Sequence, residues 1–97
     1  MAIKVPVFHP GEILCEEYLV PLGMSAGALA SKLNLPRMRI ERLVKQTHSI
    51  TADTALRLAK YFHTTPQYWL NMQLAHDLGP EATTLAAELE RIETLAA

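Results

Sequence analysis

The chain has 97 residues with a formal net charge of −1; 49% of its residues are hydrophobic and 6% are aromatic. This length supports one domain with a modest core, and many Leu and Ala residues with only four glycines are typical of an all-α protein. No apolar run is long enough for a signal peptide or a membrane span, and the lone Cys15, expected to be a buried and unreactive thiol, excludes an intrachain disulfide, so we expect a cytoplasmic protein.

Proline, glycine and capping residues divide the sequence into short helices. The first is predicted to begin with HPG at residues 9–11 and to end at residues 21–23, which read PLG. Ser25 is a suitable cap for a second helix. That helix is predicted to end at Asn34, because asparagine tolerates the left-handed conformation that a sharp turn needs.

The third predicted helix begins at Pro36 and contains the most basic stretch of the chain, PRMRIERLVKQ. With 100° between successive residues, Ile40, Leu43 and Val44 lie on one side. The outer side and its flanks carry Arg37, Met38, Arg39, Glu41, Arg42 and Lys45. The pattern therefore predicts an amphipathic helix with a cationic outer face.

Three further helices are predicted after this one. Thr51 caps a fourth helix, which reads TADTALRLAKYF, and Thr65 with Pro66 opens a fifth that ends at the Gly-Pro pair of residues 79–80. A sixth, over residues 81–95, has a narrow apolar seam on an otherwise acidic helix, which suits it to packing against another element. No strand is predicted.

The second and third helices have the layout of a helix-turn-helix unit over about residues 25–47. Ala30 is small enough to let the two helices approach closely, and Asn34 makes the turn between them. Apolar contacts that fix the crossing angle are expected from Leu29, Leu35, Ile40 and Leu43.

The basic charge is concentrated on the same unit. Residues 25–62 have seven basic and two acidic side chains, a net charge of +5, whereas residues 1–24 and 63–97 have net charges of −2 and −4. A run of charge usually indicates only a solvated face. Here arginine outnumbers lysine on the third helix, and its planar guanidinium group fits phosphate and guanine edges. We therefore interpret this face as DNA-binding.

Three stretches resemble HigA-type antitoxins, a branch of the Xre family of helix-turn-helix regulators: HPGEIL at 9–14, ITADTALRLAKYF at 50–62 and TTPQYWLNMQLAHDL at 64–78. The third is the most specific, because generic Xre domains lack its Pro-x-x-Trp-Leu-x-x-Gln pattern. The resemblance implies a lambda-repressor-like domain of five to six helices, with an extra C-terminal helix, over residues 1–97. It further implies a homodimer that binds palindromic double-stranded operator DNA, represses its own operon and neutralises a small mRNA-cleaving toxin of the RelE-like class.

The sequence departs from the family pattern at two places. Ser-Ala stands at residues 25–26 where Ser-Gln is common, and Lys-Gln-Thr-His stands at residues 45–48 where Asn-Gly-Lys-Arg is usual. These changes remove a glutamine that helps to fix the DNA backbone, a glycine suited to a left-handed cap, and two cations. Two alternatives therefore stay open: a stand-alone Xre-type repressor without a toxin, and a protein-interaction module that has lost DNA binding.

The residues predicted to contact DNA form two groups. Base edges are predicted to be reached by Arg37, Met38, Glu41 and Arg42, because arginine reads guanine, glutamate accepts from cytosine and methionine contacts the thymine methyl group. The alternative for Glu41 is an ion pair with Lys45 within the helix. Phosphate contacts are predicted for Ser25, Arg39, Lys45 and Thr47.

A homodimer interface is predicted over residues 64–97, because one helix-turn-helix unit contacts a single half-site. The contacts are assigned to Trp69, Leu70, Gln73, Leu85 and Leu89. Trp69 is also expected to anchor the fifth helix as a buried aromatic rather than to line a ligand pocket. The four histidines are scattered and no catalytic trio or phosphate loop is present, so no metal site, cofactor or catalytic residue is expected.

Overall fold

The computed structural model describes residues 8–96 and contains helices and no strand in that range. The elements are α1 (Pro10–Ile13), η1 (Leu14–Leu19), α2 (Val20–Leu22), α3 (Ala26–Leu33), α4 (Arg37–Val44), α5 (Ala52–Phe62), α6 (Pro66–Thr84) and α7 (Ala86–Glu90). The predicted all-α class is confirmed, while residues 1–7 and Ala97 of the predicted domain lie outside the described residues. Within that range no single helix is long and apolar enough for a membrane span. Residues 10–22 and 26–33 have the required length and hydropathy only when the two segments are taken together, and they are bent by 97° relative to each other.

α1, η1 and α2 follow one another as a continuous helical segment. His9 caps its start, since the imidazole Nδ1 accepts a hydrogen bond from the Gly11 N–H at 2.9 Å. The middle of the segment is a π-helix, with hydrogen bonds that span five residues. The segment ends at Gly23, within the predicted range of residues 21–23, and Gly23 has the left-handed conformation with a φ of 60°. Cys15, on the π-helical part, is half-buried rather than fully buried.

α3 and α4 form the predicted helix-turn-helix unit. Ser25 caps α3 by accepting a hydrogen bond from the Ala28 N–H at 3.0 Å. Asn34 ends α3 with a φ of 57°, which confirms the predicted left-handed turn residue. α4 follows after two residues, with Pro36 as its N-cap.

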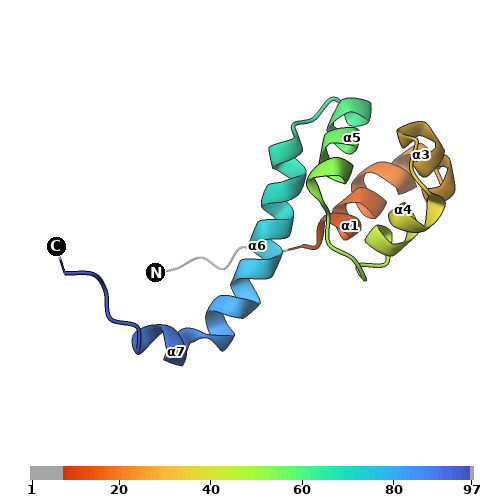
Figure 1. Cartoon of the computed structure of the whole chain (residues 1–97). Coiled ribbons are helices and arrows are strands. Elements are labelled where there is room, and N and C mark those ends of the chain that lie inside the picture. Colours follow the sequence, from red (N-terminus) through yellow and green to blue (C-terminus); the bar gives the residue numbers. More distant parts are fainter. Residues whose placement is uncertain (1–7, 97) are drawn as a thin grey trace.

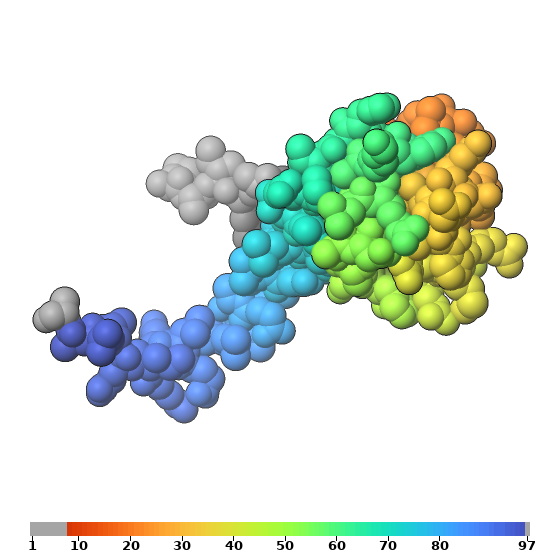
Figure 2. Space-filling view, turned by 45° about the horizontal axis from the view of Figure 1, so that its top comes forward, coloured from red at the N-terminus to blue at the C-terminus, as the bar shows by residue number. Residues whose placement is uncertain are grey.

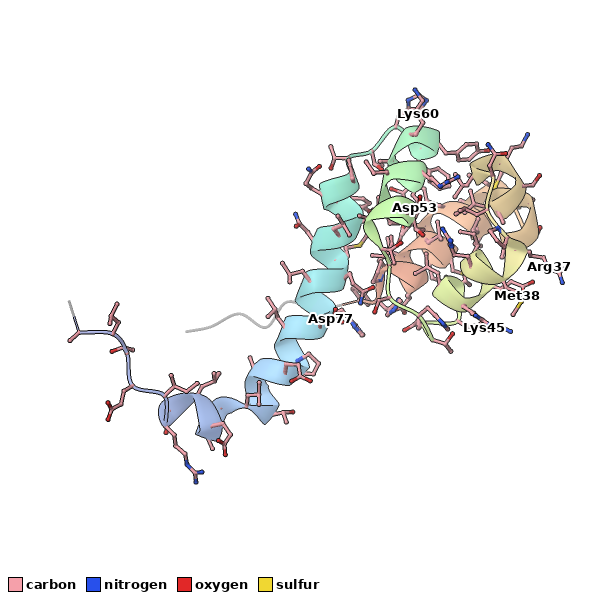
Figure 3. All side chains as sticks on the ribbon, in the orientation of Figure 1. Arg37, Met38, Lys45, Asp53, Lys60 and Asp77 are labelled. Carbon is pink, nitrogen blue, oxygen red and sulfur yellow. The ribbon has the colours of Figure 1, made fainter. Side chains whose placement is uncertain are left out.

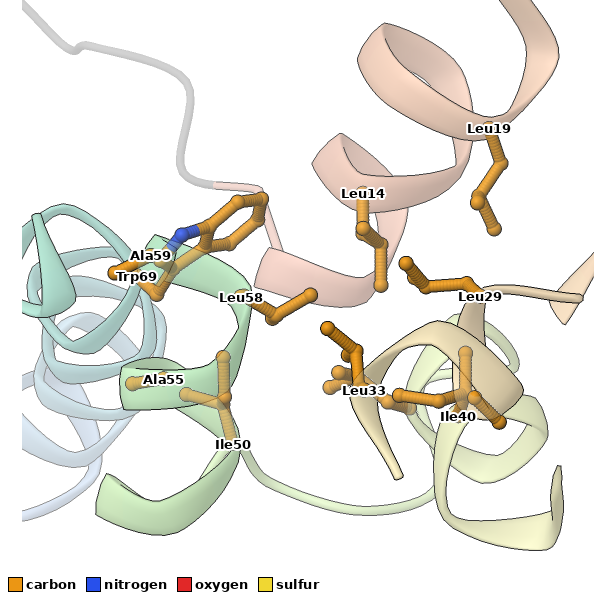
Figure 4. Packing of buried hydrophobic residues seen from close by; sticks show 12 residues of the cluster. Leu14, Leu19, Leu29, Leu33, Ile40, Ile50, Ala55, Leu58, Ala59 and Trp69 are labelled. Atoms are coloured by element: carbon orange, nitrogen blue, oxygen red, sulfur yellow. The ribbon is translucent and has the colours of Figure 1, made fainter. Parts of the chain in front are cut away.

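The core joins five elements through their largest buried side chains (Figure 4). These are Leu14 from η1, Leu29 from α3, Ile40 from α4, Leu58 from α5 and Trp69 from α6. Burial of this apolar surface supplies the main stabilisation, and α4 packs against α3 and α1. α4, the helix that the sequence predicts to contact DNA, is therefore part of the core packing.

The C-terminal helices differ from the prediction in their lengths. α6 continues through Gly79 and Pro80 to Thr84, and α7 covers only Ala86–Glu90 instead of residues 81–95. A proline inside a helix removes one hydrogen-bond donor, and here it lies in residues 77–96, which are exposed, so the missing bond does not disturb the core. The same exposure explains the short α7, since no packing supports a longer helix.

The second half of α6 and α7 form an arm that leaves the helical head (Figure 1). The chain measures 52 × 26 × 23 Å, and its radius of gyration of 16.6 Å exceeds the value of about 12.5 Å expected for a compact chain of this length. The space-filling view shows α4, in yellow, at the opposite end of the molecule from the arm, in blue (Figure 2). α4 and the arm therefore present separate surfaces.

Candidate nucleic-acid interface

α4 buries one side and exposes the other. Ile40 and Leu43 are 0% and 2% exposed, whereas Met38 is 53% exposed. Figure 3 shows Arg37 and Met38 at the outer edge of the molecule and Lys45 at the far end of the same helix. The predicted amphipathic pattern of this helix is confirmed.

The ion pairs of α4 decide which of its cations are free. Arg37 Nε lies 3.0 Å from Glu41 Oε1, so Glu41 pairs with the arginine before it and not with Lys45, the alternative that the sequence left open. Arg42 and Lys45 form no ion pair with any residue in the range 8–96. They are the cations of this face that can meet a phosphate or a base without breaking an internal pair.

Arg39, predicted to be a phosphate contact, is already engaged. Its Nη1 donates to Asp53 Oδ2 at 2.6 Å, and Asp53 also accepts from Arg57 Nε at 3.2 Å. Asp53 lies in the first turn of α5, where its charge also complements the helix dipole. A phosphate contact by Arg39, as predicted, would have to compete with the Asp53 carboxylate for the guanidinium group.

The turn after α4 uses a left-handed residue where the family pattern has glycine. Gln46 has a φ of 63°. Thr47 donates to the Arg42 carbonyl twice, through its backbone N–H at 3.0 Å and through Oγ1 at 3.1 Å. Thr47, predicted to contact phosphate, thus uses its hydroxyl proton to close the end of α4.

The starts of α3 and α4 lie side by side. A methyl group added at Gly27 would lie 2.9 Å from Cδ of Arg37, so the Arg37 side chain crosses the first turn of α3. Ser25 caps that turn with its oxygen as acceptor, which leaves the hydroxyl proton free to donate. Two helix N-termini and an arginine at one place make a suitable environment for a phosphate group.

A groove of about 630 Å³ runs between α4 and the start of α5. Its lining includes Met38, Arg39, Arg42, His48, Thr51 and Arg57. The full lining contains three arginines and one acidic residue, Asp53, so the groove carries a net positive charge and continues the outer face of α4. The loop of residues 45–51 forms part of its wall, which the sequence did not predict.

His9 is buried next to the loop that follows α4. The His9 ring lies 4.9 Å from the ring of His76, measured between centroids. Burial lowers the pKa of His9 below its ordinary value of 6.5, and His76 adds to this lowering, while Asp77, a hydrogen bond with the His48 backbone and Glu12 act in the opposite direction. The neutral imidazole is also the form that can accept from Gly11, so His9 connects the start of α1 to the loop after α4.

Two residues assigned to the dimer interface lie inside the protomer, which corrects the prediction. Trp69 is 0% exposed and donates from Nε1 to Thr64 Oγ1 at 2.8 Å, consistent with its expected role as an anchor. Gln73 is 7% exposed, and its Oε1 accepts from the Ile50 N–H at 2.8 Å. Both side chains lie on the side of α6 that faces the core, so neither presents a surface to a second copy.

The other three predicted interface residues remain accessible to different degrees. Leu70 is half-buried, whereas Leu85 and Leu89, which lie at and beyond the end of α6, are exposed. Leu74 and Leu78, which the sequence did not single out, are exposed on the same arm. Leu74, Leu78, Leu85 and Leu89 are separated by four, seven and four residues. This spacing follows the helical repeat and could have added Leu74 and Leu78 to the predicted interface.

Sequence reasoning missed the network around Asp53. The spacing of Asp53 and Arg57, four residues apart on one helix, could have indicated their ion pair. The contact with Arg39 joins two helices across 14 residues and could not be read from any local pattern. Arg57 Nη1 also donates to the Leu33 and Asn34 carbonyls at 2.8 and 3.3 Å, which ties α5 to the turn of the helix-turn-helix unit.

Known proteins share this architecture. Residues 16–69 match the family model described as Helix-turn-helix. Virulence-associated protein I of Dichelobacter nodosus is 56% identical over 75 residues, which cover 77% of this chain and 69% of that protein. The structure of an addiction module antidote protein of a HigA family from Coxiella burnetii is 43% identical, with a TM-score of 0.84 over 95% of this chain and 100% of that one. The structure of Pseudomonas aeruginosa antitoxin HigA with the higBA promoter is 35% identical, with a TM-score of 0.85 over 94% and 100%. The chain therefore belongs to the HigA-type antitoxin branch of the helix-turn-helix family.

Proposed function

We propose that this protein is a DNA-binding antitoxin that recognises its own operator through α4 and represses its own operon. The observation that carries the proposal is the exposed outer face of α4, with Arg42 and Lys45 unpaired among the described residues, on a helix held rigidly by buried Ile40 and Leu43. The HigA structure with its promoter supports the same use of the fold. We further propose that the protein works in the cytoplasm and has no catalytic role.

The contacts follow from the side chains on that face. We assign the unpaired Arg42 to a guanine edge and Met38 to a thymine methyl group. Arg37 and Glu41 are assigned to a guanine edge and a cytosine amino group as a pair, because their ion pair holds them side by side. Lys45 is assigned to a phosphate, with Ser25 at the start of α3 as a second phosphate contact. Phosphate contacts position the protein on any sequence, whereas base contacts select the operator.

Binding of a promoter fragment from the protein's own operon tests this assignment. Arg42→Ala is expected to weaken operator binding by about 1–3 kcal/mol and to relax the base preference at one position. Lys45→Ala is expected to weaken binding to all sequences alike and to reduce the slope of log affinity against log salt by about one unit. Titrations by fluorescence anisotropy at several salt concentrations measure both effects.

Lys60→Ala is the matched control, because Lys60 also carries one positive charge but lies away from α4, at the end of α5 (Figure 3). It is expected to leave the base preference and the salt slope unchanged. Wild-type protein that shows no preference for the promoter fragment over a scrambled duplex would remove the repressor role.

The arm is proposed to pair two copies of the chain. Leu74, Leu78, Leu85 and Leu89 expose apolar side chains along it, outside the core of a single protomer. Burying exposed leucine against a second copy is favourable, and two reading helices are needed to contact two half-sites about one DNA turn apart. The interface is therefore assigned to the arm, with Leu70 at its base, and no longer to Trp69 and Gln73.

The second proposed activity is neutralisation of a toxin. It is supported by the similarity to the Coxiella burnetii antidote protein and the Pseudomonas aeruginosa antitoxin. We propose a small mRNA-cleaving toxin of the RelE-like class, encoded next to this chain. Expression of the adjacent small basic protein is expected to arrest growth, and co-expression of this chain is expected to restore it and to allow the two to be purified together.

Two other outcomes would identify the alternatives. Operator binding without rescue of growth would indicate a stand-alone repressor. Rescue of growth by a wild-type chain that binds no DNA would indicate an interaction module that has lost the function of α4.

A further inference from the structure

The network around Asp53 lies within the proposed DNA-binding surface. Asp53 and Glu41 are the two acidic residues of the basic segment 25–62, and both form ion pairs. Glu41 pairs within α4, whereas Asp53 comes from α5 and reaches across to α4. The Asp53 carboxylate is half exposed, and it lines the same groove as Met38 and Arg42.

The two arginines held by Asp53 differ in how firmly they are held elsewhere. Arg57 has two further acceptors, the carbonyl oxygens of Leu33 and Asn34, so it keeps its place without Asp53. Arg39 has Asp53 as its partner in the described part of the chain. Loss of the Asp53 charge is therefore expected to free Arg39 and to leave Arg57 where it is.

We infer that Asp53 is a specificity-determining residue, which keeps the Arg39 guanidinium group away from the DNA phosphates. The inference rests on the proposed operator binding. An arginine paired with an internal carboxylate releases no counterion when DNA binds, and a carboxylate in the groove repels an entering phosphate. Both effects weaken sequence-independent binding, and therefore increase the contribution of base contacts to the choice of site.

The salt dependence of binding separates this role from a structural one. Affinity for the promoter fragment and for a scrambled duplex is measured at several salt concentrations for the wild type, Asp53→Asn, Arg39→Gln and the double variant. Asp53→Asn is expected to steepen the slope by about 0.9 units on both duplexes, because one more phosphate is neutralised. Between 50 and 200 mM salt this corresponds to about a three- to fourfold larger loss of affinity.

The arginine variants identify the side chain responsible. Arg39→Gln alone is expected to keep the wild-type slope, because Arg39 is engaged by Asp53, and the double variant is expected to return to that slope. Glu17→Gln is the matched control: it removes one negative charge from an exposed residue of η1, outside the groove, and is expected to leave the slope unchanged.

The inference is overturned by an Arg39→Gln slope that is lower than wild type by about one unit, or by an Asp53→Asn slope equal to wild type. An equal steepening by Glu17→Gln overturns it as well, since the effect would then be long-range. Should Asp53→Asn not fold, Arg39→Gln alone decides. The proposed function fails if the promoter is not preferred over the scrambled duplex. The role of Asp53 can still be tested in that case, from the slopes on the scrambled duplex. A wild-type chain that binds neither duplex overturns both the proposed function and the role of Asp53.

Discussion

Among residues 8–96, the non-glycine residues with a positive φ are Asn34, Gln46 and His63, and Gln46 is the one whose type is least suited to it. Its φ of 63° lies in the left-handed region, which costs a non-glycine residue about 1–2 kcal/mol. Gln46→Gly is therefore expected to raise the free energy of unfolding by about 0.5–1 kcal/mol, after the extra flexibility of glycine in the unfolded chain is subtracted. Urea unfolding of the two proteins measures the difference.

Gln46→Ala is the control, because alanine shortens the side chain and keeps the strained φ. It is expected not to stabilise the protein. Equal stabilisation by alanine and glycine would show that the side chain, and not the backbone conformation, is responsible.

A second prediction about a single residue concerns His9, whose protonation makes the free energy of unfolding depend on pH. Because burial lowers the pKa of His9 below 6.5 in the folded state, the unfolded chain binds a proton first as the pH falls. The contribution of His9 to the free energy of unfolding is therefore expected to be fully present above pH 6.5 and to be lost as the pH falls below it. Unfolding measured from neutral pH down to about pH 5 tests this direction.

Substitution of His9 by asparagine removes the titrating group and retains an acceptor suited to a helix N-cap. The His9→Asn variant is expected to lose part of this pH dependence. The matched control is His63→Asn, because His63 is exposed and in a left-handed conformation that asparagine tolerates. A pH dependence that His63→Asn removes and His9→Asn retains would contradict the assignment.

At the scale of elements, the position of α4 depends on a close approach by α1. A methyl group built on Gly11 would lie 1.8 Å from the Leu43 carbonyl oxygen, near the end of the reading helix. Because the obstacle is backbone, the two helices must separate to make room. Gly11→Ala is expected to lower the free energy of unfolding by at least about 2 kcal/mol and to weaken operator binding.

Gly79→Ala is the matched control, since a methyl group there would meet nothing within 4 Å and Gly79 lies inside α6. It is expected to raise stability by about 0.5–1 kcal/mol through helix propensity. Thermal and urea unfolding compare the two. The packing argument would fail if Gly11→Ala were as well tolerated as Gly79→Ala.

The elements themselves were largely predictable. The starts of α3, α5 and α6 follow from Ser25, Thr51 and Thr65, each of which accepts a hydrogen bond from an N–H three residues later. The end of α6 was predicted wrongly, because glycine and proline at residues 79–80 stop a helix only where the lost hydrogen bond is costly. Whether that position is buried depends on the tertiary structure.

For the whole molecule, the arm is the feature without an internal partner. The double substitution of Leu85 and Leu89 by serine is expected to give monomers at protein concentrations where the wild type is a dimer. Operator affinity should fall with it, because each monomer contacts one half-site. Sedimentation equilibrium and anisotropy titrations measure the two effects on the same preparations.

The helical head of this variant is expected to unfold as in the wild type when both are monomeric. Leu56→Ser provides the control, because Leu56 is similarly exposed but lies on α5, away from the arm. A wild-type chain that sediments as a monomer at micromolar concentration, or a Leu56→Ser variant that dissociates equally, would contradict the proposed dimer.

The sequence by itself determined the helices, the left-handed Asn34 turn and the basic outer face of α4, because these depend on residues within about four positions of one another. Only the tertiary structure decided that Arg39 faces Asp53 and that Gln73 turns inward to the Ile50 N–H. Those contacts join residues 14 and 23 positions apart. Their proximity is set by the angles at which whole helices pack around the core, and no local pattern of residues records those angles.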